Sequence, residues 1–196
     1  AHELNNPLTG ILGYAQLLQE GPCPPELKAD LEKINTDALR CKRIIENLMR
    51  FARKEKPQRG VVNVNEELEA VLELRRYQLT VGNITVVRRL APALPYTLAD
   101  GNQLQQVVLN LLNNAVDAMQ EYRGRGTLTV TTAVVGERIR ITIADDGPGI
   151  PADVLPRIFD PFFTTKEVGK GTGLGLSVSY GIIREHGGEI LVQTAP

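Results

Sequence analysis

Two stretches of helical periodicity occupy the first 52 residues. Apolar residues recur at alternating steps of four and three in residues 4–18 and again in residues 27–52. Such spacing lines one face of a helix and is typical of helices that pack in bundles. A turn rich in Gly and Pro at residues 21–25 makes the two helices antiparallel neighbours. The predicted seam consists of Leu4, Leu8, Ile11, Ala15, Leu18, Leu27, Leu31, Ile34, Ala38, Cys41, Ile45, Leu48 and Ala52.

The two predicted helices differ in length. When Leu18 lies opposite Leu27, the last seam positions of the second helix have no partner in this chain. We therefore expect the first helix to begin upstream of Ala1. Two helices with wide apolar faces are a poor fold alone, so two hairpins are expected to form a dimeric four-helix bundle. Cys41 on the seam is expected to be a buried, inert thiol.

The rest of the chain shows the pattern of an α/β domain. Strands are predicted at residues 61–64, 84–90, 127–135, 138–144 and 189–193, and helices at 66–79, 100–121 and 173–186. Asn65 and Asp100 are the expected N-caps of the first two helices. The predicted fold class is α+β: an antiparallel helical hairpin (residues 1–56), then an α/β sandwich (57–196) with a mixed sheet and helices on one face.

Two glycine clusters flank an aromatic loop near the end of the chain. Gly147 and Gly149 follow a predicted strand in DDGPGI, and GKGTGLGL places Gly at every second position before an apolar helical run. Glycine lets a backbone approach a ligand closely, and a helix N-terminus offers N–H groups to phosphate. The spacing fits neither a P-loop nor a dinucleotide fingerprint. A flexible turn is the alternative to a phosphate-binding loop.

Polar residues on the predicted 100–121 helix form a second candidate site. Gln106, Asn110 and Asn114 are one turn apart on one face, and Asp117 follows. Helix interiors disfavour Asn, so two stacked Asn residues need a reason. Amide oxygens are suitable ligands for Mg²⁺, which bridges to phosphates. A solvated amide ladder on an exposed face is the alternative.

His2 lies beside the hairpin seam, next to Glu3 and one turn before Asn6. An imidazole with a neighbouring carboxylate is a suitable phosphoryl acceptor. An ordinary surface histidine is the alternative.

Composition narrows the class of protein. The 196 residues are 42% hydrophobic with a formal net charge of −1, which suits one or two domains with cores and gives no support for nucleic-acid binding. No apolar run is long enough to span a membrane, and no signal peptide is visible. The two cysteines form no disulfide framework or metal motif. We expect a cytoplasmic location, with any membrane anchor in segments beyond this sequence.

Five motifs occur in order along nearly the whole chain: HELNNPL, NLLNNAVDA, DDGPGI, FDPFFTTK and GTGLGL. Together they resemble the H, N, G1, F and G2 boxes of sensor histidine kinases of two-component signalling. The hairpin is similar to their dimerisation and phosphoacceptor domain, and the remainder resembles the ATP-binding domain shared with gyrase, MutL and heat-shock chaperone ATPases. The resemblance implies a homodimer that uses ATP and Mg²⁺ to phosphorylate a histidine, then passes the phosphoryl group to an aspartate in a response regulator receiver domain.

The resemblance also assigns roles to individual residues. His2 would be the phosphoacceptor, Glu3 its adjacent acid, and Asn6 the residue that orients water when the partner is dephosphorylated. Asn114 would bind the metal with Asn110 assisting, and Asp145 would accept a hydrogen bond from adenine. Residues 159–170 would form a lid over ATP. The other residues that the resemblance implies in nucleotide binding are Asp117, Gly147, Gly149, Ile150, Phe159, Lys166, Lys170, Gly171, Thr172, Gly173, Leu174 and Gly175.

One position separates phosphoryl transfer from hydrolysis. Hydrolytic relatives carry Glu one turn before the metal-binding Asn, where this chain has Asn110, which accepts a proton poorly. Asp146 departs from the usual Asn or Thr of the family, and we expect the domain to lack the family's last strand. Two alternative functions stay open: a phosphatase of the partner that uses Asn6, and a non-catalytic ATP-binding dimerisation module.

Overall fold

The computed structural model describes residues 2–21, 24–52, 58–167 and 171–194. The chain divides into two compact units, residues 1–55 with 162–174 and residues 56–161 with 175–196. The predicted domain boundary after residue 56 falls in the segment 53–57, outside the described residues, and stays a prediction. In the part of the chain that the structure describes, no helix combines the length and hydropathy needed to cross a membrane.

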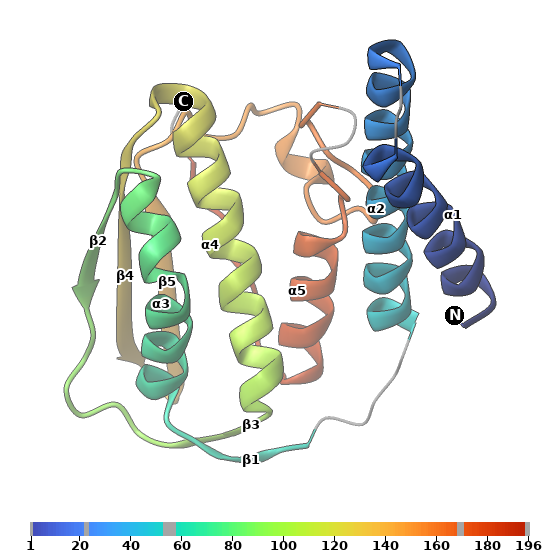
Figure 1. The fold of residues 1–196 in the computed structure, drawn as a ribbon. Helices are drawn as coiled ribbons and strands as arrows, with labels where there is room; N and C mark the ends of the chain where they lie inside the picture. The colour runs from blue at the N-terminus through green and yellow to red at the C-terminus, as the bar shows by residue number, and fades with distance from the viewer. Residues whose placement is uncertain (1, 22–23, 53–57, 168–170, 195–196) are drawn as a thin grey trace. The chain divides into compact units, whose positions relative to one another are not determined.

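The first unit is built on two antiparallel helices, α1 (His2–Glu20) and α2 (Pro25–Ala52), as Figure 1 shows. The predicted hairpin is confirmed. The helices bury a narrow line of side chains at their contact: Ala15, Leu31 and Ala38 of the predicted seam, and Leu12, which the seam prediction did not include. Other seam residues keep about half of their surface exposed: Ile11 (47%), Leu18 (56%), Leu27 (48%) and Ile34 (47%). The hairpin therefore leaves an open apolar face.

Cys41 lies on this open side, and the structure describes it as a free, exposed cysteine. The expectation of a buried thiol is therefore wrong for the single chain. The reason is geometric, because an apolar stripe on a helix is wider than the strip that one neighbouring helix covers. A seam position is buried within one hairpin only where it faces the other helix directly.

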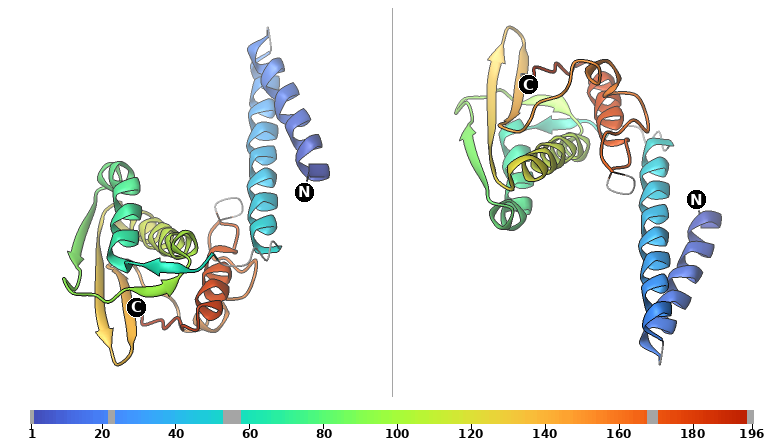
Figure 2. Two further views of the ribbon diagram at one scale, coloured as in Figure 1. Left: turned by 90° about the horizontal axis from the view of Figure 1, so that it is seen from below. Right: turned by 90° about the horizontal axis from the view of Figure 1, so that it is seen from above.

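The second unit is an α/β sandwich. Strands β2 (Ile84–Arg89), β4 (Gly126–Val135) and β5 (Arg138–Asp145) form one sheet in the order β2-β4-β5, with β2 parallel and β5 antiparallel to β4. Helices α3 (Val64–Val81), α4 (Gly101–Arg123) and α5 (Gly175–Glu185) lie on one side of this sheet (Figures 1 and 2). The predicted mixed sheet with helices on one face is confirmed.

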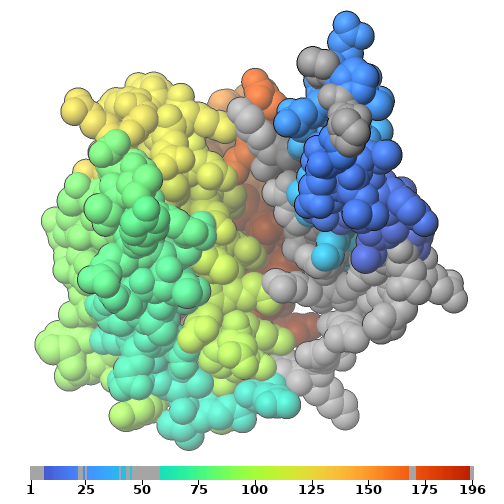
Figure 3. All heavy atoms as spheres, viewed as in Figure 1, coloured from blue at the N-terminus to red at the C-terminus, as the bar shows by residue number. Residues whose placement is uncertain are grey.

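Alternation along β4 explains how this sheet meets its helices. Leu128, Val130 and Thr132 are buried at every second position, as expected for a strand with one covered face. Leu112 and Met119 of α4 pack in the same core, each 1% exposed. Figure 3 shows α3 and α4 side by side. Helix α4 is thus held rigidly at the centre of the unit.

Asp100 caps α4 as predicted. Its Oδ1 accepts from the backbone N–H of Gln103 (3.1 Å), and its Oδ2 accepts from the backbone N–H of Gln58 (2.8 Å). Its own backbone N–H donates to Nε2 of His186 (3.0 Å), and Nδ1 of His186 contacts the carbonyl oxygen of Ile182 (2.8 Å). These bonds tie the start of α4 to the end of α5.

The predicted N-cap of α3 is wrong by two residues. Asn63 is the cap: its side chain accepts from the Asn65 N–H (3.1 Å) and donates to Oε1 of Glu66 (2.8 Å). Asn65 instead joins α3 to the sheet, because it donates to the carbonyl oxygen of Ala91 (2.9 Å) and accepts from Oγ1 of Thr132 (2.9 Å). Asn65 therefore makes long-range hydrogen bonds to Ala91 and Thr132 in place of the predicted capping bond within α3.

Other elements of the second half of the chain also differ from prediction. Residues 189–194 form no strand: Glu189 reaches Arg138 of β5 (3.8 Å) and Thr194 accepts from Ile150, but both contacts involve side chains. Helix α5 begins two residues later than predicted, because Gly173 has a positive φ of 65°. Strand β3 (Thr97–Ala99) was not predicted and exists through antiparallel pairing with β1 (Gly60–Val62).

Candidate functional site

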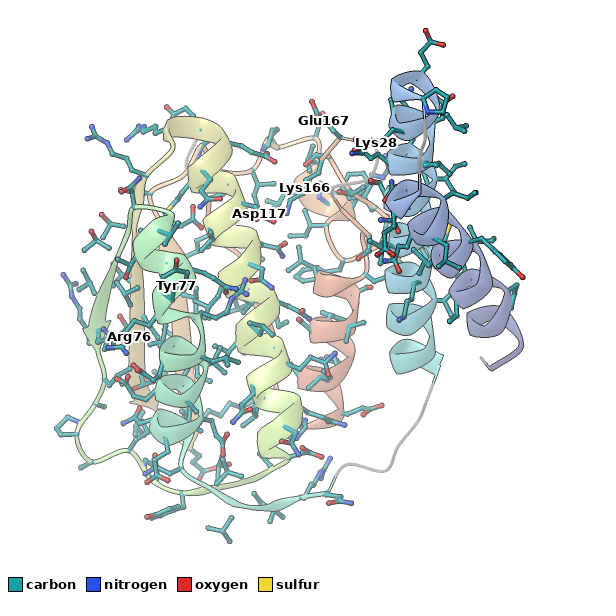
Figure 4. All side chains as sticks on the ribbon, in the orientation of Figure 1. Lys28, Arg76, Tyr77, Asp117, Lys166 and Glu167 are labelled. Carbon is teal, nitrogen blue, oxygen red and sulfur yellow. The ribbon has the colours of Figure 1, made fainter. Side chains whose placement is uncertain are left out.

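Helix α4 carries three of the predicted site residues on one face. Asn110, Asn114 and Asp117 are spaced by four and three residues, and all three are half-buried. Figure 4 labels Asp117 on α4. The polar face of α4 is therefore partly covered, which differs from the alternative of a solvated amide ladder on an exposed face.

Asn110 connects α4 to the first turn of α5. Its Nδ2 donates to the carbonyl oxygen of Gly175 (3.1 Å) and to Oγ of Ser179 (3.2 Å). The structure thus brings together Asn110 and Gly175, which are 65 residues apart. Ser179 was not predicted as a site residue, and a small polar residue inside an apolar helical run is the only sequence feature that could have indicated it.

Asp145 ends β5, and the glycine loop that follows holds its carboxylate in place. The backbone N–H of Gly147 donates to Oδ1 of Asp145 (3.0 Å). A Cβ atom at Gly147 would lie 2.7 Å from that oxygen and 3.5 Å from Cβ of Ala118 in α4. Position 147 therefore favours glycine, since a side chain there would displace the Asp145 carboxylate from its present position. Gly149 (φ 74°) and Ile150 continue this loop.

Asp146, the departure from the family pattern, fixes the start of β4. Its Oδ1 accepts from the backbone N–H of Thr127 (2.7 Å). It lines a pocket of about 210 Å³ together with Arg123, Arg125 and Thr127. A hydrogen bond to Tyr122, then the charges of Tyr122 and Asp146, raise the pKa of the Arg123 guanidinium. Asp146, which follows β5, is thus engaged with the start of the neighbouring strand β4, whereas Asp145 bonds to its own loop.

The loop between β5 and α5 contains the short 3₁₀ helix η1 (Leu155–Arg157) and the predicted lid, residues 159–170. The ring of Phe159 packs against Tyr180 of α5 with centroids 5.1 Å apart. Within the lid, Oγ1 of Thr164 accepts from the backbone N–H of Lys166 (3.2 Å). Lys170 lies outside the described residues.

A backbone bond closes the neck of this loop. The N–H of Phe162 donates to the carbonyl oxygen of Gly173 (3.0 Å), and both residues have positive φ, 67° and 65°. Beside this bond, Oγ1 of Thr172 accepts from the backbone N–H of Leu174 (3.4 Å), and the side chain of Leu174 is buried, with 1% of its surface exposed. Gly171 lies next to Thr164. No feature of the sequence indicates that Phe162 adopts a positive φ, so the sequence did not predict its bond to Gly173.

His2, Glu3 and Asn6 lie in α1, and their side chains fall outside the described residues. The structure therefore assigns these three residues to a helix and assigns no side-chain geometry to them.

The donor set on α4 fits a metal that arrives with phosphates. Among the residues that the structure describes, no group of three or more His, Cys, Asp or Glu could hold a metal ion. The amide oxygens of Asn110 and Asn114 and the carboxylate of Asp117 are hard ligands. Mg²⁺ accepts such ligands and completes its coordination with waters and phosphate oxygens. The residues present thus suit Mg²⁺ bound with a nucleotide.

Two family models match the chain. Residues 99–196 match the histidine kinase-, DNA gyrase B-, and HSP90-like ATPase family, and residues 1–57 match the His Kinase A (phospho-acceptor) domain. The chain belongs to the sensor histidine kinases. This histidine kinase chain is 38% identical over 212 residues to the sensory histidine kinase/phosphatase NtrB of Rhodobacter capsulatus, a match that covers all of the chain and 57% of NtrB.

Solved histidine kinase structures share the fold. Full-length ShkA in complex with AMPPNP superposes with a TM-score of 0.76 at 27% identity, over 98% of this chain and 42% of ShkA. ThkA in complex with the response regulator protein TrrA gives a TM-score of 0.68 at 27% identity, over 96% of this chain and 53% of ThkA. The chain spans 26% to 57% of the length of the first three curated relatives it matches.

Proposed function

We propose that this chain is the catalytic core of an ATP-dependent protein-histidine kinase that phosphorylates His2 and passes the phosphoryl group to an aspartate of a response regulator. One observation carries the proposal: a phosphoacceptor-type helical hairpin with His2 precedes a domain in which α4 lies beside the Asp145 loop at Ala118 and hydrogen-bonds to α5 through Asn110. The same helix, which carries candidate nucleotide residues itself, thus adjoins two other elements that carry them.

The first reaction is a phosphoryl transfer from ATP. A nitrogen of the His2 imidazole attacks the γ-phosphorus, the bond from that phosphorus to the β–γ bridging oxygen breaks, and ADP leaves with the electron pair. Glu3 accepts the proton that the imidazole loses. The second transfer moves the phosphoryl group from the His2 nitrogen to a carboxylate oxygen of the regulator.

The candidate residues divide the work of binding ATP. Asp145 accepts from the adenine amino group, and Gly147 keeps its carboxylate fixed. Asn114, with Asn110 and Asp117 beside it, holds Mg²⁺, which when bound neutralises phosphate charge. The other proposed contacts, made by the adenine loop, the lid and the N-terminus of α5, are those of Gly149, Ile150, Phe159, Lys166, Lys170, Gly171, Thr172, Gly173, Leu174 and Gly175.

The experiment that tests this function is incubation of the chain with γ-labelled ATP and Mg²⁺. We expect label on the protein in a linkage that acid destroys and base preserves, because a phosphoramidate hydrolyses in acid. Label that survives acid would point to a Ser or Thr ester and contradict the proposal.

Asp145→Asn should weaken ATP binding by about tenfold or more. The Gly147 N–H holds Oδ1, so the amide nitrogen of Asn would replace Oδ2 and present a donor to the adenine amino group, itself a donor. Titration calorimetry with ATP measures the change. Asp153→Asn is the matched control, since Asp153 is exposed and has no proposed contact with adenine. Equal affinity of the Asp145 variant and the parent would remove Asp145 from the adenine site.

The open apolar face of the hairpin, including Ile11, Leu18, Leu27 and Ile34, supports a homodimer through a four-helix bundle. Sedimentation equilibrium at micromolar concentration checks this, and a monomer would contradict it. The response regulator partner is supported by the complex of ThkA with TrrA.

A phosphatase activity toward the phosphorylated regulator is a second candidate, favoured by the kinase/phosphatase name of the relative NtrB. Asn6, one turn after His2, would orient the attacking water. Asn6→Ala should slow dephosphorylation of a phosphorylated regulator by about tenfold or more, while labelling of His2 by ATP changes much less. The time course of phosphate release measures the rate. Unchanged dephosphorylation would exclude the role of Asn6.

A further inference from the structure

Ser179 is the most deeply buried polar side chain of α5, with 0% of its surface exposed. A buried hydroxyl is unfavourable unless it forms hydrogen bonds. Its Oγ donates to the carbonyl oxygen of Gly175 (2.9 Å), one turn earlier in the same helix. It also accepts from Nδ2 of Asn110 in α4 (3.2 Å). The hydroxyl therefore joins two helices that meet at the proposed nucleotide site.

These bonds determine which end of the Asn110 amide faces α5. The carbonyl oxygen of Gly175 can only accept, so the group that bonds to it must be the NH₂ end of the amide. Nδ2 lies within hydrogen-bond distance of both the Gly175 carbonyl oxygen and the Ser179 hydroxyl. Oδ1 is consequently turned away from the Gly175 carbonyl, where it can bind a cation or a water molecule.

We propose that Ser179 is a positioning residue that holds the Asn110 amide in the orientation used in the Mg²⁺–ATP site. This inference rests on the proposed function. It adds Ser179 to the site and requires a hydrogen-bond donor at position 110. Position 110 must donate hydrogen bonds, because a carboxylate there would place oxygen against the Gly175 carbonyl. The same clamp that orients Asn110 thus disfavours the acidic residue that hydrolytic relatives carry at this position.

A purely structural role makes a different prediction. Serine often bonds to a carbonyl oxygen four residues earlier in its own helix, and such a bond depends on no other helix. A structural serine would affect nucleotide binding equally with and without Mg²⁺, and whatever residue occupies position 110. A positioning residue acts only through Asn110 and only on the metal-dependent part of binding.

The test is a double-mutant cycle read by nucleotide titration. Ser179→Ala should weaken ATP binding about tenfold in Mg²⁺ and less than about twofold in EDTA. In an Asn110→Ala background, the same change should have less than about a twofold effect in Mg²⁺. Ser177→Ala is the matched control, because Ser177 is a buried serine of the same helix, whereas the bonds of Nδ2 of Asn110 go to Gly175 and Ser179.

Additive losses in the two backgrounds, or equal losses with and without Mg²⁺, would overturn the proposal. Ser179→Cys guards against a folding defect, since sulfur keeps the volume and bonds weakly; it should lose Mg²⁺–ATP affinity several-fold with the thermal unfolding midpoint preserved. A parent chain that binds Mg²⁺–ATP but transfers no label would contradict the proposed function alone, because this cycle measures binding and not transfer.

Discussion

His2→Gln should reduce the acid-labile label from γ-labelled ATP to background, a fall of roughly a thousandfold or more given what loss of a nucleophile costs such transfers. A glutamine amide nitrogen has its lone pair delocalised and cannot attack phosphorus. ATP binding should stay within about twofold, because the adenine and metal residues lie on α4, α5 and the Asp145 loop. Filter binding after alkaline electrophoresis measures the label, and calorimetry measures the binding.

The chain offers a matched control, because it contains two histidines. His186 accepts a hydrogen bond from the Asp100 N–H through Nε2, and its Nδ1 contacts the Ile182 carbonyl oxygen, so both nitrogens are engaged with backbone. His186→Gln should therefore keep the label once corrected for the folded fraction. Label that persists in His2→Gln and disappears in His186→Gln would reverse the assignment of the acceptor.

Local patterns predicted the elements whose cause is local. The two helices of the hairpin, the capping carboxylate of Asp100 and the alternation that buries Leu128 and Val130 each arise within a few residues. Strand β3 (Thr97–Ala99) could not be predicted, because three residues become a strand only through pairing with β1. Residues 189–194 show the converse case: a strand-like sequence whose contacts with Arg138 of β5 and with Ile150 of the following loop involve its side chains.

The candidate site also combines features with a local cause and features that depend on tertiary packing. Spacing identified Asn110 and Asn114 as a shared helix face, because a helix repeat is local. It could not show that Nδ2 of Asn110 donates to Gly175, or that Ser179 completes this contact, because both depend on the packing of α4 against α5. The sequence therefore predicted which residues could bind Mg²⁺–ATP, and the structure added how one of them is oriented.

Gly173→Ala should weaken ATP binding by about tenfold to a hundredfold, because it opens the neck of the lid loop. Gly173 has a φ of 65°, which costs an L-residue about 1–2 kcal/mol. A Cβ atom there would lie 2.6 Å from the carbonyl oxygen of Phe162 and 2.7 Å from its Cα, and backbone cannot rotate aside. The Phe162 N–H bond to the Gly173 carbonyl should break, which frees the lid from its closed neck.

Gly181→Ala is the control that separates this effect from a general cost of replacing glycine. Gly181 lies inside α5, and a Cβ atom there would meet nothing within 4 Å. Alanine should raise the free energy of unfolding by about 0.5–1 kcal/mol and leave ATP affinity unchanged. Urea unfolding followed by circular dichroism and calorimetric titration with ATP measure the two quantities. If Gly173→Ala binds ATP as tightly as Gly181→Ala, the Phe162–Gly173 neck has no part in holding the lid for the nucleotide, and the proposed contacts of residues 171–175 with phosphate fall with it.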